Sequence, residues 1–296
     1  QANSAASLDL YLVGLDRSFL SRRTCFVYQC GLLLRLIVSK RVAAANPYWQ
    51  SLPTSQKFTP DGYAKGYGRY SQDVLVPAFL AAYAGKDPST VALIKQSNAK
   101  VSTNPFGGII PKPNWRITYT GLTKIPALAE KFNNISFSHS YKGNLSMNSF
   151  NSALLYQDPF RLGGPSFMDT VSGNFVPFFL VPNITMQESF EPLFGVDFTT
   201  NKQMSMHFEY RKGRQLSLSL VDYQLSESRS TEWVFGFSLR TQGLNLPFTI
   251  PGMKNAKLVN DLTVKVDLSM RDVSNSNSRL DQTNAYGTGG QKEITI

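Results

Sequence analysis

The chain has 296 residues, 42% of them hydrophobic and 12% aromatic, and 30 Lys and Arg against 20 Asp and Glu give a formal net charge of +10. This length can bury one large core or two smaller ones. It lacks a helical membrane span, because the most apolar stretch, residues 25–39, is interrupted by Arg35 and falls short of roughly 18–20 apolar residues. Gln1 is not an initiator and no signal peptide follows it, so we expect an internal piece of a longer protein.

The positive charge raises the question of nucleic-acid binding. Basic residues are spread along the chain, their one dense group lies within residues 1–45, and no pattern of a known nucleic-acid module accompanies them. Solvated loops and polar strand faces account for such a charge. We therefore expect no nucleic-acid partner.

Residues 1–45 are basic and Leu-rich and carry no pattern that predicts a structure. Both cysteines, Cys25 and Cys30, lie here, with a spacing that matches no common zinc or redox motif. A local disulfide in an oxidising compartment and two unpaired thiols both stay open.

Residues 46–112 are expected to form a loop with short helices. Gly, Pro and Tyr are frequent at first, and Asp73 then begins an apolar run that contains Pro77 and ends at Gly85, a typical helix stop. These helices are too short to cross a membrane, and we expect them to plug, cap or line a loop. The expected elements are an aromatic, Gly-rich loop over 46–70, a helix over 73–85 interrupted near Pro77, and one or two helical turns over 90–96 with Asp87 or Ser89 as N-cap.

Residues 113–296 are expected to form antiparallel strands and hairpins, with a long Gly/Pro-rich loop near 159–177. Apolar and polar residues alternate strictly in several runs, which indicates strands with one apolar and one polar face. Their lengths approach the roughly 9–11 residues of a membrane-crossing strand rather than the 5–6 of an average soluble one. The clearest apolar positions are Leu262, Val264, Val266, Leu268 and Met270, and the same rhythm occurs over 204–210 and 233–239.

The apolar phase that begins at Met204 continues to Leu218 across Lys212-Gly213-Arg214. A three-residue loop at this point gives a hairpin with consistent faces, in which Gly213 supplies a positive φ. One continuous strand keeps the phase as well, but it places Lys212 and Arg214 on the apolar face. A cation there costs about 2–4 kcal/mol at a bilayer midplane, so that alternative requires the stretch to project beyond the hydrocarbon.

No catalytic constellation is recognisable in the sequence. His139 and His207 lie in alternating strand patterns without a matched nucleophile, and the acidic residues occur singly. A pair of glycosidase acids is left open, because the distance that matters is spatial. We expect no enzyme, no catalytic residue, no metal site and no cofactor.

Several motifs in sequence order resemble the C-terminal region of the SprA/Sov family. They are DVLVPAFLAAYAGKDP (73–88), PKPNWRITYTGL (111–122), SFSHSYKGNLSMNSF (136–150), EPLFGVDFTT (191–200), YRKGRQLSLSLVDYQLSE (210–227) and VFGFSLR (234–240). The likeness runs from about residue 46 to the end; residues 1–45 are atypical, and the last strands of a complete member are missing. The motif positions to which we assign structural roles are Pro113, Asn114, Trp115, Tyr119, Gly121, Leu122, Pro192, Leu193, Phe194, Gly195, Arg214, Leu216, Leu218 and Gly236.

Members of this family are outer-membrane translocons of the type 9 secretion system, which also support gliding motility. The resemblance implies an all-β fold, a sector of a very large transmembrane antiparallel β-barrel, with short α-helices in an N-terminal plug-like region. It implies a non-catalytic role in exporting folded cargo proteins across the outer membrane of a Gram-negative bacterium. The implied partners are outer-membrane lipid, secreted cargo proteins, and plug and PorV-like accessory subunits.

In such a wall, the apolar positions from Leu262 to Met270 face lipid or a partner protein, and Lys265, Asp267 and Arg271 face a polar lumen. Aromatic residues gather where a barrel meets the membrane interface, and they also pack inside barrels. The candidates for either place are Trp115, Tyr119, Tyr141 and Trp233. The rival functions are another large outer-membrane barrel, a receptor or transporter, and a soluble secreted β-sandwich that acts as a binding module.

Overall fold

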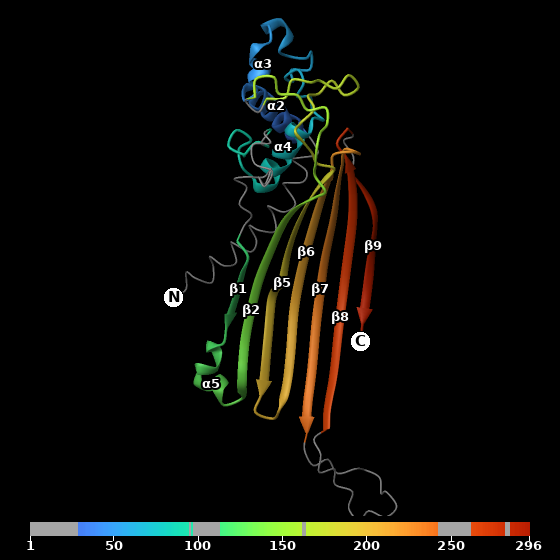
Figure 1. Cartoon of the computed structure of the whole chain (residues 1–296). Coiled ribbons are helices and arrows are strands. Elements are labelled where there is room, and N and C mark those ends of the chain that lie inside the picture. Colours follow the sequence, from blue (N-terminus) through green and yellow to red (C-terminus); the bar gives the residue numbers. More distant parts are fainter. Residues whose placement is uncertain (1–28, 95, 97–112, 162–163, 242–261, 282–284) are drawn as a thin grey trace, which may run out of the picture.

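The computed structural model describes residues 29–94, 96, 113–161, 164–241, 262–281 and 285–296. These residues form one large antiparallel sheet with few helices, so the chain is mostly β-structure, as the alternating sequence predicts. The helices within residues 29–84 gather at one end of this sheet, which is called the upper end here and lies at the top of Figure 1. None of the described helices is both long enough and apolar enough to cross a membrane.

The large sheet has seven strands in the order β1-β2-β5-β6-β7-β8-β9, and all neighbours are antiparallel. Strands β2, β5, β6, β7 and β8 are 16 to 18 residues long, about three times an average strand. The strands are β1 (Trp115–Tyr119), β2 (Phe132–Asn148), β3 (Asn151–Ser152), β4 (Phe179–Leu180), β5 (Asn183–Thr200), β6 (Met204–Ser219), β7 (Gln224–Thr241), β8 (Leu262–Arg279) and β9 (Ala285–Thr295). The short pair β3 and β4 forms a separate two-stranded sheet.

The described helical elements are short. They are α2 (Gln29–Ala44), α3 (Pro47–Ser51), η1 (Thr54–Gln56), α4 (Gln72–Ala84), η2 (Gly121–Lys124) and α5 (Pro126–Ala129). The elements from α2 to α4, with the turns between and after them up to residue 94, are called the helical unit. By contrast, η2 and α5 lie at the lower end of the sheet, in the connection between β1 and β2 (Figure 1).

The register of the strands sorts the side chains onto two faces. The apolar face carries the odd-numbered residues of β1, β2 and β7 and the even-numbered residues of β5, β6 and β8. Leu218 on β6 lies opposite Leu225 on β7, and Phe208 opposite Phe235, so the apolar positions of successive strands meet. The other face, called the polar face, carries for example Ser205, which lies opposite Ser238.

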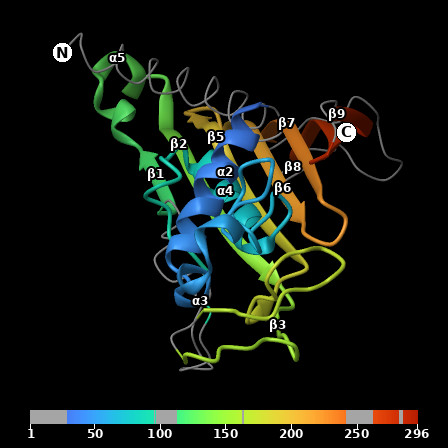
Figure 2. The same cartoon turned by 90° about the horizontal axis from the view of Figure 1, so that it is seen from above.

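The helical unit packs against the upper half of the apolar face. Buried residues of α2 and α4 form one cluster with buried residues of β5, β6 and β7, and Figure 2 shows both helices against the sheet. The sheet residues in this cluster are Ile184, Met186, Leu216, Leu218, Leu225 and Leu280. The helices that we expect to plug, cap or line a loop therefore cover the upper half of the apolar face, and their plug-like role stays a prediction.

Helix α4 and the segment after it confirm one sequence prediction and correct two. It ends at Gly85, which is left-handed with φ 62°, as expected for a glycine stop. It runs through Pro77 without interruption. The helical turns expected over 90–96 are wrong for the described residues, since Asp87 instead accepts the Ser89 N–H at 2.8 Å in a turn. Helix α2, which lies wholly within the atypical stretch 1–45, was not predicted from the sequence.

The first turn of α4 ties the helical unit to the segment that leads into β5. The Gln72 side-chain amide donates to the Phe179 carbonyl at 2.7 Å and accepts the Val181 N–H at 2.7 Å. Next to it, the buried Asp73 accepts a hydrogen bond from the Gln96 side chain at 2.6 Å. Burial raises the pKa of the Asp73 carboxyl to about 7, and the Gln96 hydrogen bond offsets only part of this rise.

This carboxyl predicts a pH dependence of the helical unit. The folded-state pKa of Asp73 lies above its ordinary value of 3.8. At a pH between these two pKa values, the protein therefore takes up a proton when it folds. Stability is then greatest below about pH 4 and falls as the pH rises towards about 7. Denaturant midpoints measured from pH 4 to pH 8 should fall for the wild type and stay flatter for Asp73→Asn. Equal slopes for the two proteins would contradict this account of Asp73.

Candidate functional site

The lower half of the apolar face carries no cover among the residues that the structure describes. Large apolar side chains that are over a third exposed line it on five strands, whereas the same face is buried under the helical unit above. This surface, called the bare half, is formed by Trp115, Ile117, Tyr119, Phe194, Trp233, Phe235, Leu239, Leu262, Val264, Val266, Met270 and Ile294, with partly buried Val196, Phe198, Met204, Met206, Phe208, Tyr210, Phe237 and Leu268 between them.

The size of the bare half is unusual for a soluble monomer. A typical soluble protein exposes an apolar patch of at most about 300–600 Å² and scatters its other exposed apolar residues. Here the exposed residues are contiguous, since the strands that carry them are hydrogen-bonded neighbours. On β8 the exposed apolar positions run from Leu262 to Met270, close to the roughly 9–11 residues with which a tilted strand crosses a bilayer.

A row of aromatic rings marks the upper border of the bare half. Trp115 on β1 stacks on Tyr141 on β2, with ring centroids 4.5 Å apart, and Tyr141 contacts Phe190 on β5 at 5.2 Å. Tyr210 on β6 stacks on Trp233 on β7 at 4.2 Å. Three of the four predicted interfacial aromatics, Trp115, Tyr141 and Trp233, thus lie in one row; the fourth, Tyr119, lies at the lower end of β1.

Directly above the aromatic row, the apolar face carries buried charges. The Arg214 Nε donates to Glu227 Oε1 at 2.7 Å, and the Arg229 Nε donates to the same oxygen at 2.8 Å. Both Arg214 and Glu227 are almost wholly buried. A buried charge is tolerated when it is paired and hydrogen-bonded, and this pairing stabilises these three charged side chains on the apolar face.

Helix α4 completes this polar layer from the other side. Tyr83 hydrogen-bonds Glu188 on β5, which also accepts the Tyr141 hydroxyl hydrogen at 2.7 Å. Burial raises the pKa of the Tyr83 phenol well above its usual value, with further support from the nearby Glu188 charge. The edge of the helical unit is thus joined to the sheet by polar contacts at the point where the bare half begins.

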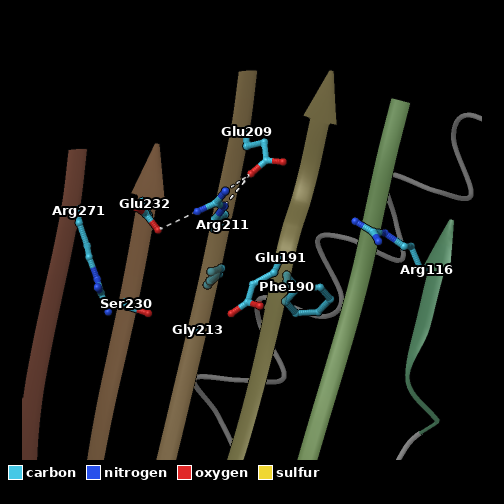
Figure 3. Close-up of a pocket in the computed structure, with 10 residues that line it drawn as sticks. Arg116, Phe190, Glu191, Glu209, Arg211, Gly213, Ser230, Glu232 and Arg271 are labelled. Carbon is cyan, nitrogen blue, oxygen red and sulfur yellow. Dashed lines mark hydrogen bonds and ion pairs between the residues drawn. The ribbon is translucent and has the colours of Figure 1, made fainter. Parts of the chain in front are cut away.

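The polar face is hollowed at mid-height, over β5, β6 and β7 (Figure 3). The hollow has a volume of about 450 Å³ and a floor of small residues, Gly213 and Ser230. A Cβ atom at Gly213 would meet the Ser230 hydroxyl at 2.5 Å, so a larger residue there would displace this side chain and fill part of the hollow. Its other lining residues are mostly charged, namely Arg116, Phe190, Glu191, Glu209, Arg211, Lys212, Glu232 and Arg271.

Three of the charged residues around the hollow pair with one another. The Arg211 Nε donates to Glu209 at 2.7 Å, and its Nη1 lies 3.6 Å from Glu232. His207 contacts both Asp197 and Glu209 beside the hollow, and is a strand-face histidine as predicted. Within the described part of the chain, no group of three or more His, Cys, Asp or Glu side chains is placed to hold a metal. Cys25 lies outside the described residues.

The residues of the sequence motifs are not brought together in one site. Asn114 accepts the Gly143 N–H at 2.7 Å, which fixes the start of β1, and Gly121 lets the Tyr119 ring approach. Leu216 and Leu218 lie under the helical unit, while Gly236 faces Asp267 on the polar face. The remaining motif positions are Pro113 and Trp115 at β1, Leu122 in η2, Pro192, Leu193, Phe194 and Gly195 at an irregularity of β5, and Arg214 in the buried ion pair.

The segment across Lys212-Gly213-Arg214 is one continuous strand, β6, and not a hairpin. Both cations point to the apolar face, and Arg214 is stabilised there by Glu227 on the neighbouring strand. Tyr210 lies on the apolar face, as the alternation over 204–210 predicts. Its contact with Trp233 and the pairing of Arg214 with Glu227 depend on the register of β6 and β7, for which the sequence carries no signal.

No protein-family model matches the sequence, and no curated protein matches it either. The likeness to the SprA/Sov family therefore stays a prediction from the motifs.

The covered and bare halves should respond differently to loss of apolar side chains. Leu218 is 0% exposed beneath the helical unit, whereas Leu239 is 36% exposed in the bare half. In detergent, Leu218→Ala should lower the free energy of unfolding by about 2–5 kcal/mol, because it leaves a cavity. Leu239→Ala should lower the free energy of unfolding by well under half of that amount, because this side chain is partly exposed. Denaturant unfolding measures both, and equal losses would contradict the division into halves.

Proposed function

We propose that this chain is a sector of the wall of a large outer-membrane β-barrel, with its bare half against lipid and its polar face towards a water-filled interior. The bare half, bounded by the row from Trp115 to Trp233, is the observation that carries the proposal. Membrane barrels have an outward apolar band about 25 Å tall with aromatic girdles at its borders. The bare half has both features on one face, and polar residues occupy the other.

The length of the strands supports the same function. A crossing takes about 9–11 residues, whereas β6 has 16 and β8 has 18. The upper parts of the strands therefore extend beyond the hydrocarbon, and the helical unit covers their apolar face there. This placement also keeps Arg214 out of the lipid, where a cation would be costly.

We further propose that the barrel is the protein-conducting translocon of type 9 secretion, which exports folded cargo and supports gliding motility without catalysis. The six ordered motifs carry this finer step. The polar face also supports the translocon proposal. It carries many hydroxyl side chains and charges of both signs, which suit a hydrated surface that lets cargo pass without binding it tightly. Outer-membrane lipid, cargo proteins, and plug and PorV-like subunits are the partners that the proposal includes.

The two rival functions differ in how much the structure supports them. A receptor or transporter barrel shares the geometry of the wall but not the ordered motifs. A soluble β-sandwich needs a second sheet over the bare half, and the described residues supply only the pair β3 and β4 besides the large sheet. The bare half therefore favours a barrel wall over a sandwich.

The three tryptophans test this function directly. Trp49 is buried in the helical unit, whereas Trp115 and Trp233 lie on the bare half. With the full chain refolded into vesicles that contain brominated lipid, Trp49→Phe, which keeps the other two, should be strongly quenched. The double variant Trp115→Phe with Trp233→Phe should be quenched little, because only Trp49 remains and it lies beyond the hydrocarbon.

The same fluorescence also shows when the proposal fails. Equal quenching of both variants would mean that the bare half is not the membrane-facing surface. A monodisperse β-rich protein in plain buffer, with no quenching of either variant by lipid, would favour the soluble binding module.

A further inference from the structure

Three lysines lie on neighbouring turns at the lower end of the sheet. Lys124 ends η2, Lys131 follows α5, and Lys202 lies in the turn between β5 and β6. All three side chains are exposed, and none forms an ion pair with another described residue. Glu130 is the one acidic residue in these two connections. These turns, residues 120–131 and 201–203, are called the lower rim.

Hydrogen bonds hold the parts of the lower rim together. The Asn201 side-chain amide donates to the Glu130 carbonyl at 2.7 Å, and the Asn201 N–H donates to the Lys131 carbonyl at 3.3 Å. The turn that carries Lys202 is thus fixed beside the end of α5. The backbone positions of Lys131 and Lys202 are therefore set by the fold and do not depend on a ligand.

The lower rim continues the apolar surface of the bare half. Ile117 and Tyr119 on β1 are about half exposed, and Ile125 between η2 and α5 is similarly exposed. Lysines beside such residues can lay their methylene stems along apolar surface and extend the ammonium group outwards. This combination is typical of elements at the border between hydrocarbon and headgroups.

Two upper connections of the sheet differ from the lower rim in their charged residues. At the upper end, the turn between β6 and β7 carries Asp222, and Asp281 after β8 pairs with Arg279 at 3.0 Å. Acidic residues thus occupy the upper turns, and unpaired lysines the lower rim.

We infer that the lower rim binds anionic lipid headgroups, with Lys124, Lys131 and Lys202 at the level of the phosphates. The inference rests on the proposed membrane function, since it places the rim at the border of the lipid that covers the bare half. A cation near an anionic bilayer contributes roughly 1 kcal/mol, or about fivefold in affinity, and this attraction fades with added salt.

The test compares two triple variants of the full chain that remove the same charge. Lys124→Gln, Lys131→Gln and Lys202→Gln alter the rim, and a matched triple, Lys40→Gln, Lys65→Gln and Lys86→Gln, alters the helical unit. Co-flotation with phosphatidylcholine vesicles, with and without phosphatidylglycerol, gives the preference of each protein for anionic lipid at low and high salt.

At low salt the wild type should prefer the anionic vesicles, and the rim triple should lose about a hundredfold of this preference. The helical-unit triple should keep most of it, and Glu130→Gln should increase it. If the rim triple keeps the preference, or the helical-unit triple loses as much, the inference is wrong although the membrane function stands. If no protein floats with either kind of vesicle, the proposed function fails together with it.

Discussion

The apolar face of the large sheet has to be kept from water along the whole length of its strands. Its five longest strands are 16 to 18 residues long, and their register puts apolar side chains from all five on one side. The chain itself covers the upper half of this face with the helical unit, where Leu218 and Leu225 are buried. The lower half stays bare, and its cover has to come from outside the described residues. Lipid is the cover that the proposed function supplies.

The border between the two halves explains why charges occur on an apolar face. Arg214 and Arg229 share one oxygen of Glu227, and Glu188 bonds residues of both the sheet and α4. The cost of burying these charges is offset by the number of their partners. This layer is too polar for hydrocarbon, and it lies where the helical unit ends and the bare half begins. The aromatic row just below it suits the same border.

The sequence predicted the elements that depend on local pattern. The alternating residues from Leu262 to Met270 form a strand with one exposed apolar face. Helix α4 ends at Gly85, as predicted. Features that depend on distant residues escaped prediction. Arg214 lies on an apolar face because Glu227 comes from the next strand, and α2 buries Arg35 while Leu33 is exposed, the reverse of an ordinary amphipathic helix. The polar hollow at Gly213 likewise forms only when strands β5 to β7 lie side by side.

Hydrogen exchange of the full chain, compared between lipid nanodiscs and plain buffer, tests the division of the apolar face most directly. The account predicts that amides of the lower strand segments, such as Met204–Tyr210 of β6 and Leu262–Met270 of β8, become strongly protected only in the bilayer. The proposed function places α4 outside the hydrocarbon, so its amides should gain much less protection from the lipid than these segments. Equal protection of the lower segments in plain buffer, in a monomeric protein, would contradict the claim that lipid covers the bare half.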